Sequence, residues 1–511
     1  MKKIAISLVV CMLLAMLGAS MIGVSAAEVE YVSLDLANGN ITIDETGFFT
    51  GDAGPYAWTG NYIIKSTGTD TDATASTIKI EGTTTKIILD NVNMSATKTM
   101  ISIEKNSDVT LILRGENKVK FKDAATTNTS AGTAISVHAT SKLTIDAESA
   151  TDSLEVLGGF YGAAIGSAQD SYTTSAQIVI NAGIINATTG GNANGSEGAA
   201  IGGARNAGAQ VTINGGVITA TSIRNGAAIG AGRESPDGST VTINGGIVKT
   251  DGGTNAMGIG GGFKSTATIT INGGIIEADT PCASTGFEGI GYGVDWQKLT
   301  TSDVTNYKVT VNGGSIKTTK QNGGADSTII AYASDGTGLV KTAVTLPTAS
   351  AYVYVDGTAQ HLDGVHTGDT NNTYYMYLKT GTTPKLQIGD KEVTVTPGTA
   401  VAASDWTTAS SSVSAPTVNI PEKDTVKVVD VSSLSTSATT TQAITAPTTA
   451  ATTTAATTTA AGDGAEATTT AATTTAAEEE GGCGSAIGVS SIALIASAAV
   501  LGAAAKKKKE D

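Results

Sequence analysis

The chain has 511 residues, and it combines 62 glycines with only 4% aromatic and 15% charged residues. A compact α/β enzyme of this length normally carries more aromatic and charged side chains, so the composition favours β structure with many tight corners. The formal net charge of −15 disfavours a nucleic-acid partner, because nucleic acids bind to basic surfaces.

Residues 1–27 have the pattern of a secretory signal peptide. Two lysines precede a long apolar run, and the small residues of VSAAE follow that run. Cys11 lies inside the run, so we expect it to be removed on secretion. The remaining cysteines, Cys282 and Cys483, are far apart in sequence. We therefore expect neither a structural disulfide nor a cysteine-rich metal site.

Residues 28–160 contain strand-like segments at irregular spacing. The segments KIILDNVNMSA, DVTLILRGENKVKF and SKLTIDAE alternate apolar and polar residues. This alternation is typical of half-buried β-strands. We expect this region to form the N-terminal coils and cap of a β structure that continues into the next region.

Residues 161–325 contain an internal repeat with a period of about 30 residues. A strand-like VTIN phrase recurs with Gly-Gly or Ala-Gly after its asparagine, and a GAAIG phrase recurs in step with it. Periods of about 20–50 residues indicate a solenoid, a propeller or an array. The repeated asparagines are Asn181, Asn214, Asn244, Asn272 and Asn312.

The repeat favours an all-β, right-handed parallel β-helix over separate hairpins. Asn-Gly between two apolar runs also predicts a hairpin turn, but hairpins with such short strands would bury almost nothing. Stacked coils of three short strands bury one continuous core, and parallel crossovers are nearly always right-handed. We expect the five asparagines to form a structural ladder, in which each amide bonds to the coils above and below.

The C-terminal part is predicted to contain four further regions. Residues 326–430 read as a small β cap or module, which a solenoid needs because its open end is an exposed sheet edge. In residues 431–484 the chain becomes rich in Thr and Ala from about Ser435 to Glu480, and the segment ATTTAATTTAAGDGAEATTTAATTTAAEEE has no core-forming residues. They predict a flexible low-complexity stalk that is open to O-glycosylation.

The last two regions predict a membrane anchor. Residues 485–505 contain no charge and are long enough to cross a bilayer as a helix. The basic tail at 506–511 then lies in the cytoplasm by the positive-inside rule. A soluble Gly/Ala-rich helix is the alternative for 485–505. The predicted location of the body is therefore extracellular, with C-terminal anchoring to the membrane.

The sequence contains few groups that suggest catalysis or cofactor binding. His138, His361 and His366 are scattered, and HLDGVH lacks a zinc-binding pattern, so we expect ordinary surface histidines. The phrase GIGGGFK does not have the spacing and the strand-to-helix context of a P-loop, and because its glycines recur in every coil we expect them to be packing residues. A polysaccharide lyase would gather acidic residues around Ca²⁺. Because no such cluster is visible, we predict no certain cofactor and keep Ca²⁺ as the one candidate metal.

Three cations follow the GAAIG phrase at similar distances in successive repeats. If the coils stack in register, these cations form a basic column along one edge of the solenoid. Such a column could bind carboxylates of an acidic polysaccharide through charge-assisted hydrogen bonds. The alternative is that they pair with nearby acidic residues. The cations are Arg205, Arg233 and Lys264, and the acidic candidates are Glu234, Asp237 and Glu288.

The phrase GAAIGG…VTINGGxIxA, from about Gly162 to Thr318, resembles the Gly-rich parallel β-helix repeats of cell-surface proteins from Gram-positive anaerobes. The preceding segment, TGNYIIKSTG…KIILDNVNMSATKTMISIEKNSDVTLILRGENKVK, is similar to a β-helical family labelled carbohydrate-binding, members of which bind pectic polysaccharide. The ending GGCGSAIG…KKKKED looks like the anchors of such proteins. No family binding residue matches a position in this chain.

The resemblance implies a non-catalytic, adhesin-like surface protein that binds cell-wall glycan or another polysaccharide. Two alternatives stay open. The first is an extracellular polysaccharide lyase or glycoside hydrolase on the same scaffold, whose paired carboxylates could come from different coils. The second is a purely structural surface protein.

Overall fold

This computed structural model describes residues 28–66, 73–122, 132–171, 176–192, 195–281, 289–291, 293, 309–320, 331–348, 352–362, 365–366, 368–406, 425–434 and 436. The expected signal peptide, most of the expected stalk, the expected anchor and the basic tail lie outside these residues, as do Cys282 and Cys483. Within them, no helix has the length and apolar character needed to cross a membrane.

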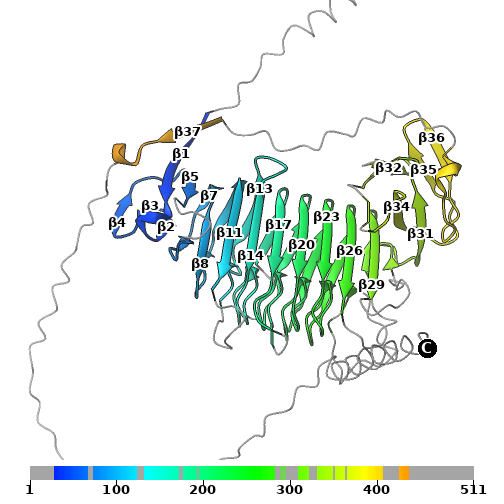
Figure 1. Cartoon of the computed structure of the whole chain (residues 1–511), viewed down its shortest axis with the longest axis horizontal. Helices are drawn as coiled ribbons and strands as arrows, with labels where there is room; N and C mark the ends of the chain where they lie inside the picture. Colours follow the sequence, from blue (N-terminus) through cyan, green and yellow to red (C-terminus); the bar gives the residue numbers. More distant parts are fainter. Residues whose placement is uncertain are drawn as a thin grey trace, which may run out of the picture.

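Three long, mainly parallel sheets form the body of the protein (Figure 1). In spatial order, the first sheet consists of β30 (Ala331–Tyr332), β28 (Val309–Val311), β25 (Ala267–Ile271), β22 (Ser239–Ile243), β19 (Gln210–Ile213), β16 (Gln177–Ile180), β13 (Lys142–Ala147), β10 (Asp108–Arg114), β7 (Thr84–Asp90), β5 (Asn61–Lys65), β1 (Glu28–Asp35) and β37 (Thr425–Val429).

The second sheet consists of β29 (Ser315–Lys320), β26 (Ile275–Thr280), β23 (Ile247–Asp251), β20 (Val217–Thr221), β17 (Ile184–Thr188), β14 (Ser153–Leu157), β11 (Glu116–Phe121) and β8 (Asn93–Ala96). The third consists of β27 (Ile290–Gly291), β24 (Ile259–Gly260), β21 (Ile229–Gly230), β18 (Ile201–Gly202), β15 (Ile165–Ser167), β12 (Ile135–Val137), β9 (Ile101–Ile103), β6 (Ile78–Ile80), β2 (Ile41–Asp44), β3 (Gly47–Thr50) and β4 (Ala53–Tyr56).

Each coil supplies one strand to each sheet, so strands that follow one another along the chain lie in different sheets. β25 and β26 flank Asn272, yet β25 pairs with β22 and β28, whereas β26 pairs with β23 and β29. Asn272 therefore occupies a corner between two sheets and is not in a hairpin turn. The prediction of an all-β protein with long parallel sheets, consistent with a β-helix, is confirmed.

Apolar side chains stack in columns to form the core. Burying one Ile or Val side chain stabilises a fold by about 1.5–3 kcal/mol, and each coil depends on its neighbours for that burial. One buried column is Ile178, Val211, Val241, Ile269 and Val309; a second is Ile185, Ile218, Val248, Ile276 and Ile316; a third, of small residues, is Ala187, Ala220, Thr250, Ala278 and Thr318.

The glycine of the GAAIG phrase is required by close stacking in the third sheet. Gly202 has a φ of +138°, and a Cβ there would lie 1.9 Å from the carbonyl oxygen of Gly230. Strand β12 has Ser136 at the position that pairs with Gly166, so this approach is specific to the later coils. The glycines of the repeat are packing residues that let the backbone stack closely.

A C-terminal module, residues 339–406, covers the end of the last coils. β31 (Leu339–Thr345) pairs with β34 (Thr373–Lys379). β32 (Tyr352–Val355), β33 (Thr358–His361), β35 (Lys385–Ile388) and β36 (Lys391–Thr394) form a separate antiparallel sheet, followed by the 3₁₀ helix η2 (Ala403–Asp405). The module has its own apolar core, and Ile275 of the solenoid packs into that core.

Strand β37 lies at the opposite end of the solenoid from the module, beside β1 (Figure 1). Lys427 Nζ lies 2.9 Å from Glu30 Oε1. Val429 in β37, and Val431 and Leu434 in and after the 3₁₀ helix η3 (Val431–Ser433), pack against the main core. This differs from the expected grouping of 326–430 as one C-terminal cap. The physical reason is that β1 would otherwise expose an open sheet edge. The short 3₁₀ helix η1 (Leu36–Asn38) follows β1, and its Leu36 is buried.

Candidate functional site

A turn that follows the third sheet brings charged residues of successive coils together. The N–H of Asn206 donates to the carbonyl of Arg233 at 2.8 Å, and the N–H of Glu234 donates to that of Phe263 at 2.8 Å. Arg205 and Arg233 therefore stack with Phe263, whereas Lys264 stacks with Glu234 and Asn206. Arg205 and Arg233 thus hold equivalent places, and Lys264 lies one residue further along its turn, as its longer distance from the isoleucine of its repeat indicates.

The turn places its second residue in the left-handed backbone region. The φ angles of Asn206, Glu234 and Lys264 are all +56°, and that of Asp170 is +54°. Asn and Asp adopt this conformation readily, but Glu and Lys do so at a cost of about 1–2 kcal/mol. Strain of this kind is retained where the surrounding structure holds the side chain in a defined place.

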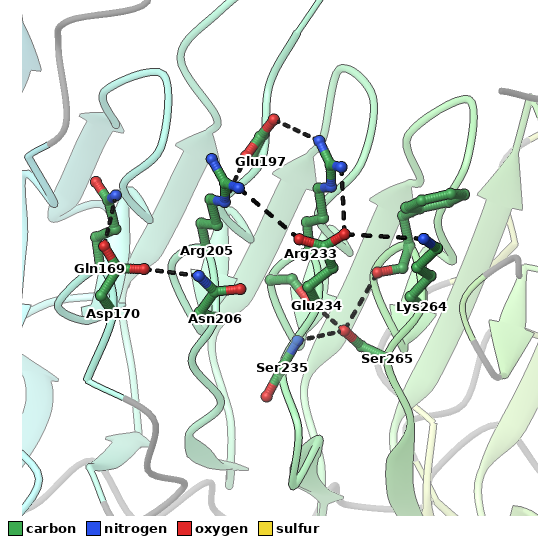
Figure 2. A network of polar contacts seen from close by, with 12 residues as sticks. Gln169, Asp170, Glu197, Arg205, Asn206, Arg233, Glu234, Ser235, Lys264 and Ser265 are labelled. Carbon is green, nitrogen blue, oxygen red and sulfur yellow. Dashed lines mark hydrogen bonds and ion pairs between the residues drawn. The ribbon is translucent and has the colours of Figure 1, made fainter. Parts of the chain in front are cut away.

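Two glutamates pair with the three cations. Glu197 Oε1 lies 2.8 Å from Arg233 Nη1, and Glu197 Oε2 lies 3.2 Å from Arg205 Nε. Glu234 lies 3.2 Å from Arg233 Nη2, 3.8 Å from Arg205 Nη2 and 4.0 Å from Lys264 Nζ. We call these five residues the charged turn column (Figure 2). Three cations against two carboxylates give it a net charge of +1.

The charged turn column has a buried layer and an exposed layer. The side chains of Glu197 and Arg233 are 8% and 9% exposed, whereas those of Arg205, Glu234 and Lys264 are 32%, 31% and 37% exposed. On folding, Glu197 and Arg233 lose contact with water and each gains a partner of opposite charge. This exchange stabilises the fold only if both partners are present. The outer residues keep polar groups at the surface in fixed positions.

Aromatic rings lie beside the cations. The Arg205 guanidinium carbon is 5.4 Å from the centre of the Tyr161 ring, and Lys264 Nζ is 5.4 Å from the centre of the Phe263 ring. Arg233 contacts the same Phe263 ring at 5.6 Å. These distances are within the range of cation–π attraction. The rings also give the column apolar surface beside its hydrogen-bonding groups.

The turn continues into a further coil with amide and carboxylate groups. Asn206 Nδ2 donates to Asp170 Oδ1 at 2.7 Å, and Gln169 Nε2 donates to Asp170 Oδ2 at 2.9 Å. Figure 2 shows Gln169 and Arg205 at corresponding places in neighbouring coils. A row of alternating donors and acceptors thus extends along this edge of the solenoid.

Sequence reasoning included the pairing with Glu234 as the alternative and missed Glu197. Asp237 forms no ion pair within the described part of the chain, and Glu288 lies outside that part. Glu197 directly precedes its GAAIG phrase, where Tyr161 and Asn225 stand in the coils before and after it. An acidic residue directly before the repeated phrase was the one sign of this pairing in the sequence. Its partners could not be recognised because they belong to two different coils.

The five repeated asparagines form an exposed hydrogen-bonded chain at the corner between the first and second sheets. Each Nδ2 donates to the Oδ1 of the preceding coil at 2.7–2.8 Å, from Asn312 to Asn272, then to Asn244, Asn214 and Asn181. Asn181 Nδ2 donates to Asp146 Oδ2 at 3.3 Å. We call this chain the Asn ladder. An amide can stack on copies of itself because it both donates and accepts.

A buried serine, histidine and glutamate meet where the module contacts the last coils. Ser315 Oγ lies 2.6 Å from His366 Nε2, and His366 Nδ1 lies 3.6 Å from Glu277 Oε1. The order resembles a nucleophile, base and acid. However, Ser315 and His366 are 0% exposed, and Ser315 Oγ already accepts from the N–H of Tyr375 at 2.7 Å. We interpret the group as a contact that holds the module in place.

This contact corrects the expectation for the histidines. His366 is buried between the solenoid and the module, not exposed in a surface loop, because Ser315 and Glu277 supply polar partners. Its neighbour in the sequence motif, Asp363, and the side chain of His361 lie outside the described residues. His138 is at the surface side of a turn, where its Nδ1 accepts from the N–H of Thr140 at 3.1 Å.

Across the segments that the structure describes, no three His, Cys, Asp or Glu residues lie close enough to hold a metal ion. A concave region of about 990 Å³ lies at the N-terminal end, between β1, β4 and β37, with Asp35, Asp52, Lys65 and Tyr56 among its lining residues. Asp35 accepts from the N–H of Ala37 and so caps η1.

Comparison with known proteins gives no match to a family model, a curated protein or a solved structure. The described architecture is consistent with a β-helix or solenoid.

Proposed function

We propose that this chain is a non-catalytic, adhesin-like β-helix protein of the cell surface that binds carbohydrate through the charged turn column. The observation that carries the proposal is the combination of fixed donors, fixed acceptors and aromatic rings along one edge. It belongs, on this proposal, with the Gly-rich surface proteins that its repeat resembles. The signal peptide, stalk and anchor expected from the sequence would display it outside the cell.

The chemistry of the column suits sugar hydroxyl groups. A hydroxyl both donates and accepts, and Arg205 and Glu234 present both functions from half-exposed side chains. Their ion pair holds the two groups in a defined geometry before a ligand arrives, which lowers the cost of ordering them on binding. The Tyr161 and Phe263 rings lie beside these groups and can contact the apolar faces of a sugar.

The charge of the column favours acidic over basic ligands. Its net charge of +1, from three cations and two carboxylates, leaves Lys264 with only a 4.0 Å contact to Glu234. A carboxylate on a pectic-type polysaccharide could approach Lys264 and Arg205 through charge-assisted hydrogen bonds. This is a weaker attraction than three unscreened cations would give, so we expect moderate affinity that falls with added salt.

The lyase or hydrolase alternative is less well supported. Glu197 and Glu234 both form ion pairs with arginines, whereas a glycosidase needs two carboxyl groups that flank the bond to be cleaved. The purely structural alternative predicts no glycan binding at all.

The test is binding of the purified full chain to insoluble pectate, with and without Ca²⁺. We expect Arg205→Ala or Glu234→Ala to weaken binding at least tenfold, and Lys79→Ala to leave it unchanged. Lys79 is the matched control because it too is half-exposed and ion-paired, with Glu81 at 2.7 Å. Release of unsaturated product, followed by ultraviolet absorbance, would overturn the non-catalytic proposal.

A further inference from the structure

An apolar patch lies on the outer face of the first sheet, at its N-terminal end, and we call it the outer patch. Its residues form a cluster that is separate from the main core. Side chains alternate between the two faces of a strand. Tyr62 and Ile64 point into the main core, so Ile63 between them points outward. The outer patch consists of Val29, Tyr31, Ile63, Ile88, Ile112 and Val426.

The centre of the outer patch is buried although it faces away from the main core. Tyr31, Ile63 and Ile88 are 0%, 5% and 1% exposed. The residues of the patch belong to β37, β1, β5, β7 and β10, which are neighbouring strands of one sheet. Neighbours in one sheet cover one another from the side and leave the outward ends of their side chains open. Burial this complete favours a further segment that lies over the patch.

The outer patch continues the column of the Asn ladder into the N-terminal coils. Parallel register pairs Ile63 with Ile88, and Ile88 with Ile112. The next residue of the column is Asp146, which accepts from Asn181 at the end of the ladder. Asp146 Oδ1 is buried and has no hydrogen-bond partner within the described residues. A buried acceptor without a donor costs free energy, so a covering segment that brings N–H groups is favoured here.

One segment of the chain has to travel from the module to the opposite end of the solenoid. Residues 407–424 join Trp406, in the core of the module, to Thr425, the first residue of β37. We call them the connector, and they lie outside the described residues. Figure 1 shows the module and β37 at opposite ends of the body. The outer patch includes Val426 of β37, so the connector ends beside it.

The connector has little spare length for this course. Ile275, which packs into the core of the module, follows directly on the corner after β25. From β25 to β37 there are nine strand spacings of about 4.8 Å, or about 43 Å in all. The 19 Cα–Cα steps from Trp406 to Thr425 span at most about 63–68 Å. A wide detour away from the side of the solenoid is therefore excluded.

The large aliphatic residues nearest the end of the connector are within reach of the outer patch. The sequence of the connector is TTASSSVSAPTVNIPEKD. Val418 and Ile420 are seven and five residues before Thr425, which limits their distance from it to about 17–25 Å. The strands of the patch lie within about 19 Å of β37 across the sheet. The segments 67–72 and 123–131 of the same coils contain no large aliphatic residue.

We propose that the connector binds the outer patch and so ties the module to the N-terminal end of the solenoid. Val418 packs on the isoleucines of β5 and β7, and Ile420 packs beside Tyr31 of β1. Backbone N–H groups of the residues before Val418 reach Asp146 Oδ1. The tie makes the contact of β37 with β1 and the contact of the module with the last coils support each other. It does not depend on glycan binding.

The experiment measures proximity by crosslinking two introduced thiols. The full chain carries Cys11→Ser, Cys282→Ser and Cys483→Ser, so that no other thiol reacts. Ile88→Cys is then combined with Val418→Cys or with Val413→Cys, and a short bis-maleimide is added. Val413 is the matched control, because a connector that runs toward the module places it beyond the patch. We expect at least a tenfold higher yield of the crosslink with Val418→Cys, and the crosslink should join two sites of one chain.

A second measurement uses the natural side chains of the patch. Val418→Asp/Ile420→Asp should release the connector, so hydroxyl-radical labelling of Ile63 and Ile88 should rise several-fold. Val413→Asp should leave this labelling unchanged. These substitutions lie outside the coils and their core, so the folded solenoid should persist, as circular dichroism would verify.

Two kinds of result would overturn the inference. The first is an equal crosslink yield from Val418→Cys and Val413→Cys, together with unchanged labelling in Val418→Asp/Ile420→Asp. The second is a crosslink between two chains, detected by mass spectrometry of a mixture of isotopically light and heavy protein. That result would assign the outer patch to the connector of a second copy, and the tie within one chain would be wrong.

Discussion

The charged turn column and the Asn ladder repeat at the same coil spacing, but they bring polar side chains of successive coils together in different ways. Two like charges about 4.8 Å apart repel by about 0.9 kcal/mol in water and by about 3.5 kcal/mol at an effective dielectric constant of about 20. Arg205 and Arg233 can therefore stack on each other only because Glu197 and Glu234 lie beside them and offset their charge. Identical amides attract one another, so the Asn ladder uses the same residue in five coils.

This difference teaches where a solenoid can hold ligand-binding groups. In a charged column most of the charged groups form ion pairs with one another. Only the side chains of the outer layer are accessible to a ligand. A corner made of amides and glycines satisfies its side chains by simple repetition. Variants at the two edges should therefore differ in stability, in salt response and in binding.

The largest expected effect is that of Glu197→Ala. The substitution removes the carboxylate that pairs with both Arg205 and Arg233, and it leaves the nearly buried Arg233 with one of its two acidic partners. Breaking a buried pair from one side typically costs about 3–5 kcal/mol. We expect a loss of that size in the free energy of unfolding, measured by urea denaturation.

The matched control for Glu197 is Glu155→Ala. Glu155 forms an equally short ion pair, 2.6 Å to Lys120, but its side chain is 47% exposed. Exposed pairs contribute about 0–1 kcal/mol. Equal destabilisation by the two substitutions would contradict the assignment of Glu197 as the buried support of the column.

The next effect concerns the Asn ladder. Asn244→Ala removes one hydrogen bond to Asn214 and one from Asn272. Each hydrogen bond contributes about 0.5–1.5 kcal/mol, and exposure puts the expected total near 1 kcal/mol. Asn186→Ala is the control, because Asn186 is also exposed and forms no side-chain hydrogen bond within the described residues. Equal unfolding midpoints for the two variants would show that the ladder does not stabilise the coils.

The parallel stack could be predicted from the sequence because its evidence is local and repeated. Each VTIN phrase shows its buried positions, and alignment of the repeats gives the register. The return of β37 could not be predicted, since Lys427 meets Glu30 across 397 residues and five residues of β37 have no distinctive pattern. The burial of His366 had the same cause, because its partners Ser315 and Glu277 belong to other elements.

The site was predicted less completely than the fold. Arg205 and Arg233 stack as expected, and the offset of Lys264 by one residue, visible in its spacing from Ile259, places it beside Glu234 and not beside Arg233 in the stack. Glu197 escaped notice because its pairing joins two coils. Alignment of the repeats shows identical residues that stack on one another. It does not show residues of opposite charge from different coils that form ion pairs.

The smallest expected effect separates the two layers of the charged turn column by salt. Glu234→Gln weakens the contacts of a half-exposed carboxylate to Arg233, Arg205 and Lys264, and we expect it to cost about 1 kcal/mol at low salt. At 1 M salt the screening length is about 3 Å, so most of this cost should disappear. The cost of Glu197→Gln should persist, because its contact to Arg233 is buried. Unfolding curves of both variants in low and high NaCl measure this difference. A parallel decline of the two costs would mean that the column has no protected layer, and that Glu197 is as accessible to solvent ions as Glu234.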